Sequence, residues 1–295
     1  MKKTFISAVI LTALLTTGCQ DKEAEAKVAQ QLQTIAQLTS ENSQLKTELS
    51  AAQQQAEQAV PAIFAKQVVL FDRNEKLTFP KGTETLTGEE GLLTYRVKTL
   101  NTGVDWLDSL FLQQLSLAGT QQLRTQAQLQ EEYQQAFEQQ REEMLKEPVF
   151  QMDSSTWLEF IGQREKIATF IRNDYNFSGG AHGMLSRQYW NIDLTTHKIL
   201  TLKDVFGGNE EKLKAVLWQH YANGAEDTFT AQADFTVSPQ FYFTNDGIRF
   251  VYNPYEIASY AEGPQEIFVW WGEVWDLLSP SFKQAEYFPE PEDNL

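Results

Sequence analysis

Two short runs of the sequence hold residue types that could contact a ligand or a partner. The first run, Tyr175–Gly183, contains three glycines within its last five positions, with a histidine among them. Glycine lets the backbone adopt positive φ and lets another chain approach closely, and histidine can titrate or bind near neutral pH. We therefore expect either a recognition loop or a tight turn between strands whose histidine packs locally. The candidate contacts are Gly179, Gly180, His182 and Gly183.

The second run, Tyr252–Pro264, mixes tyrosines with small and acidic residues. Tyrosine side chains offer a large contact area with few rotatable bonds, so they lose little entropy when they bind. Such a run suits a recognition loop between strands, although the same tyrosines could simply brace a long connection. The candidate contacts here are Tyr255, Tyr260, Gly263 and Pro264.

Catalytic and metal sites are not indicated by the sequence. The histidines His182, His197 and His220 are widely spaced and form no His-x-x-x-His pair. No Gly-x-Ser-x-Gly turn marks a serine nucleophile, and acidic residues are too frequent for one pair to be singled out. A Ser/His/Asp group assembled by the fold stays open. The sequence predicts a protein that is not an enzyme and needs no cofactor or metal. His220 falls on the apolar face of an expected helix and is expected to lie in the core.

The first eighteen residues have the pattern of a secretion signal. Lys2 and Lys3 precede an apolar segment, Phe5–Leu15, that is too short to span a bilayer. Cys19, the only cysteine of the chain, follows closely. This arrangement resembles the lipobox of bacterial lipoproteins, except that Thr16 stands where leucine is usual. We expect lipid attachment at Cys19; the alternative is an ordinary signal peptide with an incidental cysteine.

Lipidation would tie the protein to a membrane through acyl chains alone, because no other segment is long and apolar enough to span one. Each buried methylene contributes roughly 0.8 kcal/mol to such an anchor. The acylated cysteine would also leave no thiol for a disulfide or a metal site. Gln20 follows Cys19, where enteric lipoproteins retained at the inner membrane carry aspartate. The expected location is therefore the cell envelope, with the outer membrane favoured over the inner one.

The charge of the chain restricts its partners. It carries 40 acidic and 24 basic residues, a net charge of −16 at pH 7, and loss of Lys2 and Lys3 with the signal would bring this to −18. Such a field repels nucleic acid and anionic lipid surfaces and attracts basic proteins. An acidic surplus also serves solubility, so the charge favours a basic partner without requiring one.

Residues 19–61 contain no glycine and no aromatic residue, and end at Pro61. Apolar residues recur there at alternating spacings of three and four, which predicts a helix that pairs with another helix. Asn42 lies within this seam, where a buried asparagine can fix the register of a parallel pair. Two interpretations remain, a homo-oligomer through a coiled coil or a lone solvated spacer. The seam positions hold Val28, Ile35, Asn42, Leu49 and Ala56, and Gln31, Leu38, Leu45, Ala52 and Ala59.

The remaining chain predicts an α+β fold, an antiparallel sheet with packed helices, preceded by the N-terminal coiled-coil helix. Strands are expected at 67–72, 91–100, 157–162, 167–177, 187–194, 199–202, 241–243, 248–252 and 267–271. Helices are expected at 105–117, at 120–146, after Asn209 as the N-cap, and at 273–278. The residues 244–247 between two of these strands are typical of a hairpin turn.

Five motifs follow one another along the second half of the chain. They are Tyr175–Gly183, Asp193–Thr196, Leu202–Phe206, Phe243–Ile248 and Tyr255–Pro264. Together they resemble the extracellular domain family found in RsiV, a membrane-bound anti-sigma factor that senses lysozyme, over roughly residues 150–280. Residues 62–149 resemble the companion segment that precedes this domain in RsiV and in PdaC-type peptidoglycan deacetylases. The expected parts are a signal (1–18), a tether (19–61), the companion segment (62–149) and the RsiV-like domain (150–295).

The resemblance implies an extracellular binding role. The chain shows no sigma-binding region and no deacetylase domain, so neither activity is expected. Binding of lysozyme or of cell-wall glycan carries over, and the acidic charge agrees with a basic lysozyme. The leading hypothesis is a non-enzymatic envelope lipoprotein that binds lysozyme, or a similar basic wall-active protein, through 179–183 and 255–264. The alternative is a peptidoglycan-binding or structural envelope module.

Overall fold

The computed structural model describes residues 22–58, 60–82, 88–119, 122–223 and 227–291. The predicted signal and Cys19 lie outside these ranges. The chain divides into two compact units, Met1–Ala59 and Val60–Leu295, and each is described by itself.

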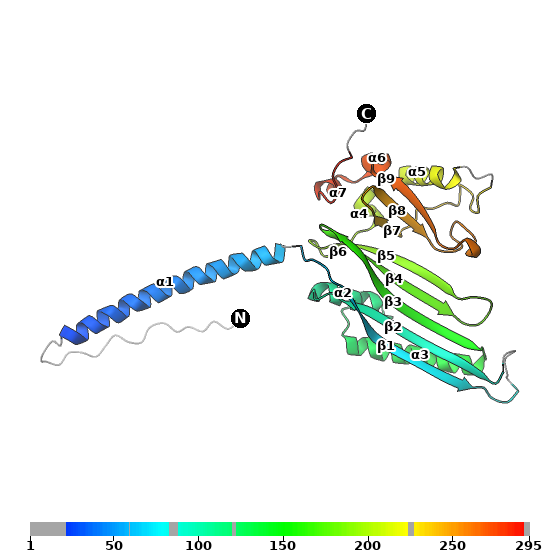
Figure 1. The fold of residues 1–295 in the computed structure, drawn as a ribbon, viewed down its shortest axis with the longest axis horizontal. Helices are drawn as coiled ribbons and strands as arrows, with labels where there is room; N and C mark the ends of the chain where they lie inside the picture. The colour runs from blue at the N-terminus through cyan, green and yellow to red at the C-terminus, as the bar shows by residue number, and fades with distance from the viewer. Residues whose placement is uncertain (1–21, 59, 83–87, 120–121, 224–226, 292–295) are drawn as a thin grey trace. The chain divides into compact units, whose positions relative to one another are not determined.

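The first unit contains one helix, α1, Lys22–Gln58, drawn in blue in Figure 1. The helix expected in this region is confirmed. The large apolar side chains of this helix, which include those of the predicted stripe, are more than half exposed. Pairing of this stripe with a second chain stays a prediction. The exposed residues are Val28, Leu32, Ile35, Leu38, Leu45 and Leu49.

The second unit is built on a six-stranded sheet whose strands follow sequence order. Neighbouring strands are antiparallel except β2 and β3, which run parallel. A parallel pair needs a crossover connection, and here the crossover consists of helices α2 and α3. The strands are β1 Lys66–Thr78, β2 Glu90–Asn101, β3 Gln151–Arg164, β4 Ile167–Phe177, β5 Met184–Asp193 and β6 Lys198–Ile199.

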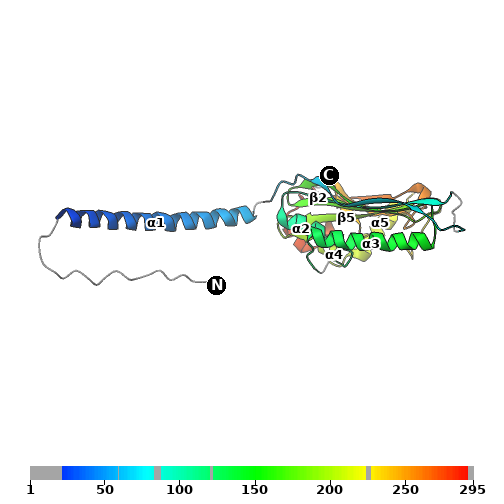
Figure 2. The ribbon, with the colours of Figure 1, turned by 90° about the horizontal axis from the view of Figure 1, so that it is seen from below.

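Helices α2, Asp105–Leu115, and α3, Gln126–Lys146, lie together on one side of this sheet (Figure 2). The apolar stripe expected on the second helix is confirmed, because its residues at spacings of four and seven are buried. Full burial of each such side chain stabilises the fold by roughly 1.5–3 kcal/mol. The buried residues of α3 are Leu129, Tyr133, Phe137 and Met144, and they pack on Leu93, Tyr95, Val97, Phe111 and Phe170.

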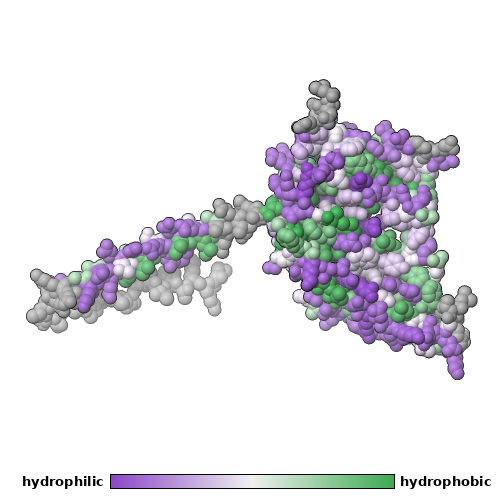
Figure 3. All heavy atoms as spheres, viewed as in Figure 1, coloured by the Kyte–Doolittle hydropathy of each residue, from purple (hydrophilic) through white to green (hydrophobic). Residues whose placement is uncertain are grey.

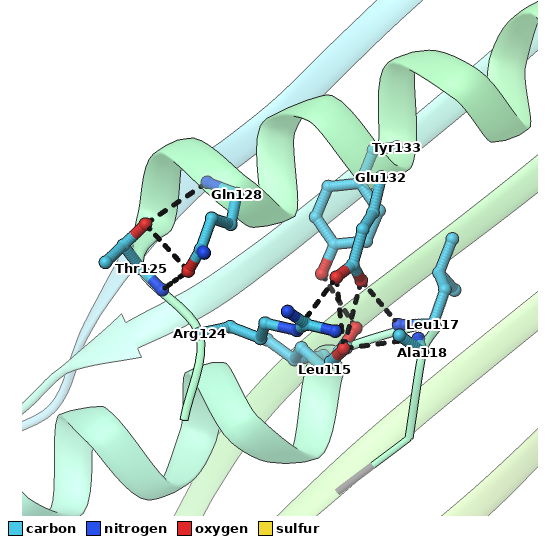
Figure 4. Close-up of polar contacts among 9 residues, drawn as sticks. Leu115, Leu117, Ala118, Arg124, Thr125, Gln128, Glu132 and Tyr133 are labelled. Carbon is cyan, nitrogen blue, oxygen red and sulfur yellow. Dashed lines mark hydrogen bonds and ion pairs between the residues drawn. The ribbon is translucent and has the colours of Figure 1, made fainter. Parts of the chain in front are cut away.

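Glu132 of α3 holds the connection between the two helices (Figure 4). Its carboxylate accepts hydrogen bonds from Leu117 N (2.9 Å) and Ser116 Oγ (3.0 Å) and forms an ion pair with Arg124 (3.1 Å). The helix was expected from residue 120, but it begins at Gln126. Thr125 explains the later start, because its hydroxyl accepts from Gln128 N in a capping box.

A second, three-stranded antiparallel sheet follows, in the order β7, β8, β9. The hairpin expected at 244–247 is confirmed, with Thr244 N donating to Gly247 O (2.8 Å). This sheet packs with the last helices around its own apolar core. The elements are α4 Leu202–Phe206, α5 Glu210–Ala222, β7 Phe241–Phe243, β8 Gly247–Tyr252, β9 Gln265–Trp270, α6 Trp271–Val274 and α7 Pro280–Gln284, with 3-10 turns at Tyr260–Glu262 and Trp275–Leu277.

Side-chain amides join the two sheets where β5 lies beside β7 (Figure 1). Gln240 Oε1 accepts from Tyr189 N (2.7 Å), and Asn253 Oδ1 accepts from Arg187 N (2.9 Å). From the other side, Asn191 Nδ2 donates to Phe241 O (2.7 Å). The first two bonds satisfy backbone N–H groups of β5, and the third satisfies a carbonyl of β7.

The expected α+β class is confirmed, and several local expectations are wrong. The strand expected at 199–202 is limited to β6, because Thr201 and Asp204 form a capping box that starts α4 at Leu202. Asn209 precedes α5, but its side chain donates to Leu277 O (2.9 Å) and makes no cap bond. The helix expected at 273–278 begins earlier, as α6.

His220 was expected in the core and is exposed instead. Its Nε2 lies 2.8 Å from Glu273 Oε1 on the surface. The buried residues of α5 are Leu213 and Leu217. His220 continues their spacing, but it lies in the last turn of the helix, where its ring reaches Glu273 at the surface.

Candidate functional site

The two runs singled out in the sequence meet in the structure. The ring of His182 stacks on the ring of Tyr260, with centroids 3.7 Å apart and planes 15° from parallel. Tyr260 Oη donates a hydrogen bond to Gly183 O (2.8 Å). Segments 77 positions apart in sequence therefore share one surface. We call this surface the loop rim, defined as residues 178–183 and 253–264.

The glycines of the first segment serve different purposes. Gly179 and Gly180 have φ of 85° and 95°, the positive values that a side chain disfavours. Gly183 has no such φ, but a Cβ placed there would lie 2.4 Å from the phenol oxygen of Tyr175. Glycine is needed at 183 because an aromatic ring lies directly over its backbone.

The second segment places its aromatic residues outward. Tyr255 has a positive φ of 73°, is 52% exposed, and its ring lies 5.8 Å from that of Tyr260. Ser259 and Glu262 form a capping box around the short 3-10 turn that carries Tyr260. A preformed turn fixes the ring of Tyr260 before any partner binds, which lowers the entropy cost of recognition.

Some of the predicted site residues lie outside the contact between the two segments. The space beside Gly180 and Gly263 is open, and Gly179 packs near the side chain of Val149. Pro264 is exposed at the end of the second segment. The structure thus brings together His182, Gly183, Tyr255 and Tyr260.

The loop rim is acidic as well as aromatic. Neither 175–186 nor 253–264 contains a lysine or an arginine, and the second segment carries Glu256 and Glu262. Hydrogen bonds from the hydroxyl and the backbone N–H of Ser259 hold the pKa of Glu262 below its usual value. Both carboxylates are exposed, so a cation on a partner can reach them.

The three histidines lie in separate surroundings. His182 stacks on Tyr260, His197 stacks on Trp106 at 3.9 Å, and His220 pairs with Glu273. Within the described ranges, no group of three His, Cys, Asp or Glu side chains is placed to hold a metal ion.

Two hollows of the second unit are not evident from the sequence. One of about 630 Å³ lies where β1 ends and β2 begins. The other, of about 350 Å³, lies on the face of the sheet away from α2 and α3. Its lining comes from four strands, so no single stretch of sequence could show it. The only local signal was the polar and aromatic alternation Ser155, Trp157, Glu159.

Comparison with known proteins identifies the fold and one domain. A family model described as "Protein of unknown function (DUF3298)" matches residues 201–272, so the chain carries a DUF3298 domain there. That range includes the second sheet and the second segment of the loop rim, but not the first segment. Comparison with curated proteins finds no significant match.

Two solved structures are similar to this chain. One is a member of the DUF3298 family from Bacteroides fragilis, with 22% identity and a TM-score of 0.58, covering 77% of this chain and 98% of that one. The other is a DUF3298 family protein from Pseudomonas aeruginosa, with 19% identity and a TM-score of 0.52, covering 79% and 99%. At these identities the likeness concerns the fold alone.

Among the residues that the structure describes, no helix combines the length and the apolar character that a bilayer span requires.

Proposed function

We propose that this protein is a non-enzymatic binding protein of the cell envelope whose loop rim contacts a basic protein, lysozyme or a similar wall-active enzyme. The observation that carries the proposal is the meeting of the two loops through His182, Gly183 and Tyr260. Because the two segments are tied together, they present one preformed surface rather than two independent flexible loops. Preformed aromatic surfaces are typical of protein recognition sites.

The charges of the rim support a basic partner. Glu256 and Glu262 are exposed beside Tyr255, and the rim segments contain no lysine or arginine to oppose an approaching cation. Lysine and arginine side chains gain from carboxylates and also from the faces of tyrosine rings. The net charge of −16 adds a longer-range attraction that speeds association.

The lipid anchor at Cys19 and a position at the outer membrane belong to the same proposal. An acylated N-terminus would hold the binding unit outside the cytoplasm, where a basic wall-active enzyme is met. The rival within this proposal is a module that binds peptidoglycan itself or serves as an envelope spacer. Salt separates the two, because attraction between opposite surface charges is screened by salt while stacking on neutral sugar is not.

The test is calorimetry of the full-length protein, kept in mild detergent, with hen egg-white lysozyme. We expect binding that weakens steeply between low and moderate salt. Tyr255→Ala should weaken it by about tenfold or more, as removal of a central aromatic contact does. Trp270→Ala is the matched control. Trp270 is 55% exposed, a fraction similar to the 52% of Tyr255, but it lies at the end of β9 that is far from the loop rim.

Absence of binding at high micromolar lysozyme, for several lysozyme types, would discard this function. Equal losses in the two variants would show that the contact is not at the loop rim. Co-sedimentation of the wild-type protein with purified sacculi at high salt, together with no lysozyme binding, would favour the rival instead.

A further inference from the structure

The face of the six-stranded sheet away from α2 and α3 carries a groove that the proposed function does not use. Both helices lie on the opposite face (Figure 2). On the face shown in Figure 3, polar and apolar residues are mixed over the unit that contains this sheet. The groove has a volume of about 350 Å³. We call it the sheet groove, and it is lined by Gln67, Arg96, Lys98, Ser155, Thr156, Trp157, Glu159 and Tyr175.

The register of the strands brings the main side chains of the groove together. Arg96 on β2 is paired with Ser155 on β3, which is paired with Tyr175 on β4. Two positions further along, Lys98 is paired with Trp157. Residues two apart on a strand point to the same face, so these five side chains form two adjacent rows across the sheet.

Hydrogen bonds to carboxylates orient two of the side chains that line the groove. Trp157 Nε1 donates to Glu159 Oε1 (2.6 Å), which fixes the indole ring. Arg96 Nε donates to Asp72 Oδ2 (3.2 Å), which orients the guanidinium and leaves its other nitrogens available. Lys98 has no ion-pair partner among the residues that the structure describes, so its charge is not neutralised by a direct neighbour.

The lining matches one chemical class of ligand. Indole and phenol rings offer flat apolar walls, which suit the C–H face of a sugar ring, and the amide, hydroxyl and carboxylate groups suit its hydroxyls. Two cations in one hollow are unusual in a chain with 40 acidic and 24 basic residues, and they complement a carboxylate. The volume lies within the range of about 300–1,000 Å³ typical of small-molecule sites.

We propose that the sheet groove binds a short oligosaccharide that carries carboxylate groups. Trp157 and Tyr175 stack on a sugar ring, and Lys98 pairs with the carboxylate. This site goes beyond the proposed function, since it uses other residues and a partner of opposite charge. Carboxylates on sugars come from muramic acid in wall glycans or from uronic acids in other polysaccharides, and the probes below separate these sources.

The experiment titrates the full-length protein in detergent with three probes. They are a disaccharide of N-acetylglucosamine and N-acetylmuramic acid, a tetramer of galacturonic acid, and neutral tetra-N-acetylchitotetraose. We expect at least one acidic probe to bind more tightly than the neutral one. Lys98→Gln should lower the affinity for the acidic probe by about tenfold, the effect of one lost charged contact. The affinity for the neutral probe should not change.

Trp157→Ala should abolish binding of every probe, and Trp270→Ala, which removes an exposed indole elsewhere, should change nothing. If Trp157→Ala does not keep the wild-type circular dichroism spectrum, Trp157→His replaces it as the variant that removes the indole. Tightest binding of the muramic acid probe identifies wall glycan as the source, and tightest binding of the galacturonate identifies a uronic acid polymer.

The proposal is overturned if no probe binds at about 1 mM, a concentration at which even weak sites are occupied. It is also overturned if the folded Trp157 variant binds like the wild type, or if Lys98→Gln affects acidic and neutral probes equally. Tyr255→Ala, which tests the loop rim, should leave sugar binding intact. The failure of one site is thereby distinguishable from the failure of the other.

Discussion

At the scale of single residues, Asp193 shows how hydrogen bonds stabilise a buried charge. The residue is 1% exposed, at the end of β5, and accepts hydrogen bonds from Thr195 N (2.8 Å), Thr195 Oγ1 (2.7 Å) and Tyr287 Oη. Burial opposes its ionised form, but the bonds from Thr195 and Tyr287 outweigh burial and hold the pKa of the carboxyl below its usual value. Tyr287 thereby fastens the C-terminal segment to the first sheet.

Tyr287→Phe should therefore reduce the free energy of unfolding by about 1.5–3 kcal/mol at pH 7, the usual contribution of a hydrogen bond to a charged group. Because the pKa of Asp193 is lower in the folded than in the unfolded state, its contribution is present above about pH 4 and is lost as the pH falls through the folded value. The difference between variant and wild type should shrink below that pH. Urea unfolding at several pH values measures it.

Tyr242→Phe is the control, since its hydroxyl donates to Glu266 at an exposed position and should contribute little. A Tyr287→Phe protein as stable as the wild type at pH 7 would contradict the assignment.

Residue types alone were enough to single out His182 and Tyr260, but not to predict their contact. The stacking depends on how the second sheet sits beside β5, which involves residues far from both loops. The sheet groove was missed for the same reason, because Lys98, Trp157 and Tyr175 become neighbours only through strand register. Gly183 was selected for its freedom of φ, whereas its actual role is to leave room for Tyr175.

At the scale of elements, the joint between the two sheets depends on side chains rather than on a backbone ladder. Gln240 and Asn253 accept from backbone N–H groups of β5. A buried N–H without a partner costs about 1–3 kcal/mol, so each amide stabilises the placement of the second sheet. The loop rim depends on this placement, since one of its segments comes from each side of the joint.

Gln240→Ala should lower the free energy of unfolding by about 1–3 kcal/mol, because it leaves Tyr189 N without its acceptor. Urea denaturation followed by tryptophan fluorescence measures the change. Gln188→Ala replaces an exposed glutamine on β5, next to Tyr189, and should stay within about 0.5 kcal/mol of wild type. Equal stability of the two variants would argue against a structural role for the amide.

The sequence predicted the elements themselves better than their ends. Alternation and apolar stripes placed every long strand and helix, since burial of one face determines both patterns. The strands expected at 67–72 and 157–162 are longer in the structure, Lys66–Thr78 and Gln151–Arg164. Other errors fall where a side chain forms a hydrogen bond that the pattern does not show. Thr125 and Thr201 begin helices through capping bonds. The amide of Asn209 donates to Leu277 O and does not cap α5, the helix that follows it.

At the scale of the whole molecule, the heptad pattern of α1 predicts pairing with a second chain. Val28, Ile35, Leu38, Leu45 and Leu49 lie at positions of the predicted stripe and are more than half exposed. We expect the full-length protein in detergent to be a dimer through this stripe. The double variant Leu38→Lys, Leu45→Lys should shift it to monomer by placing like charges in the seam, as sedimentation velocity would show.

The variant Gln37→Lys, Gln44→Lys adds the same charge outside the seam, at positions that bond to Glu41 and Glu48, and should remain dimeric. A wild-type protein that sediments as a monomer at all concentrations would make α1 a simple spacer.

The parallel pairing of β2 with β3 determines whether residues 62–149 and 150–295 can fold apart. Residues 62–149 contribute two strands and two helices, and residues 150–295 contribute the rest of the same sheet. A chain cut near Phe150 would bare the long edge of β3 and strip the helices from the sheet, and such an edge invites aggregation. Because both halves contribute to one sheet, gene fusions that carry one half without the other are expected to yield insoluble protein.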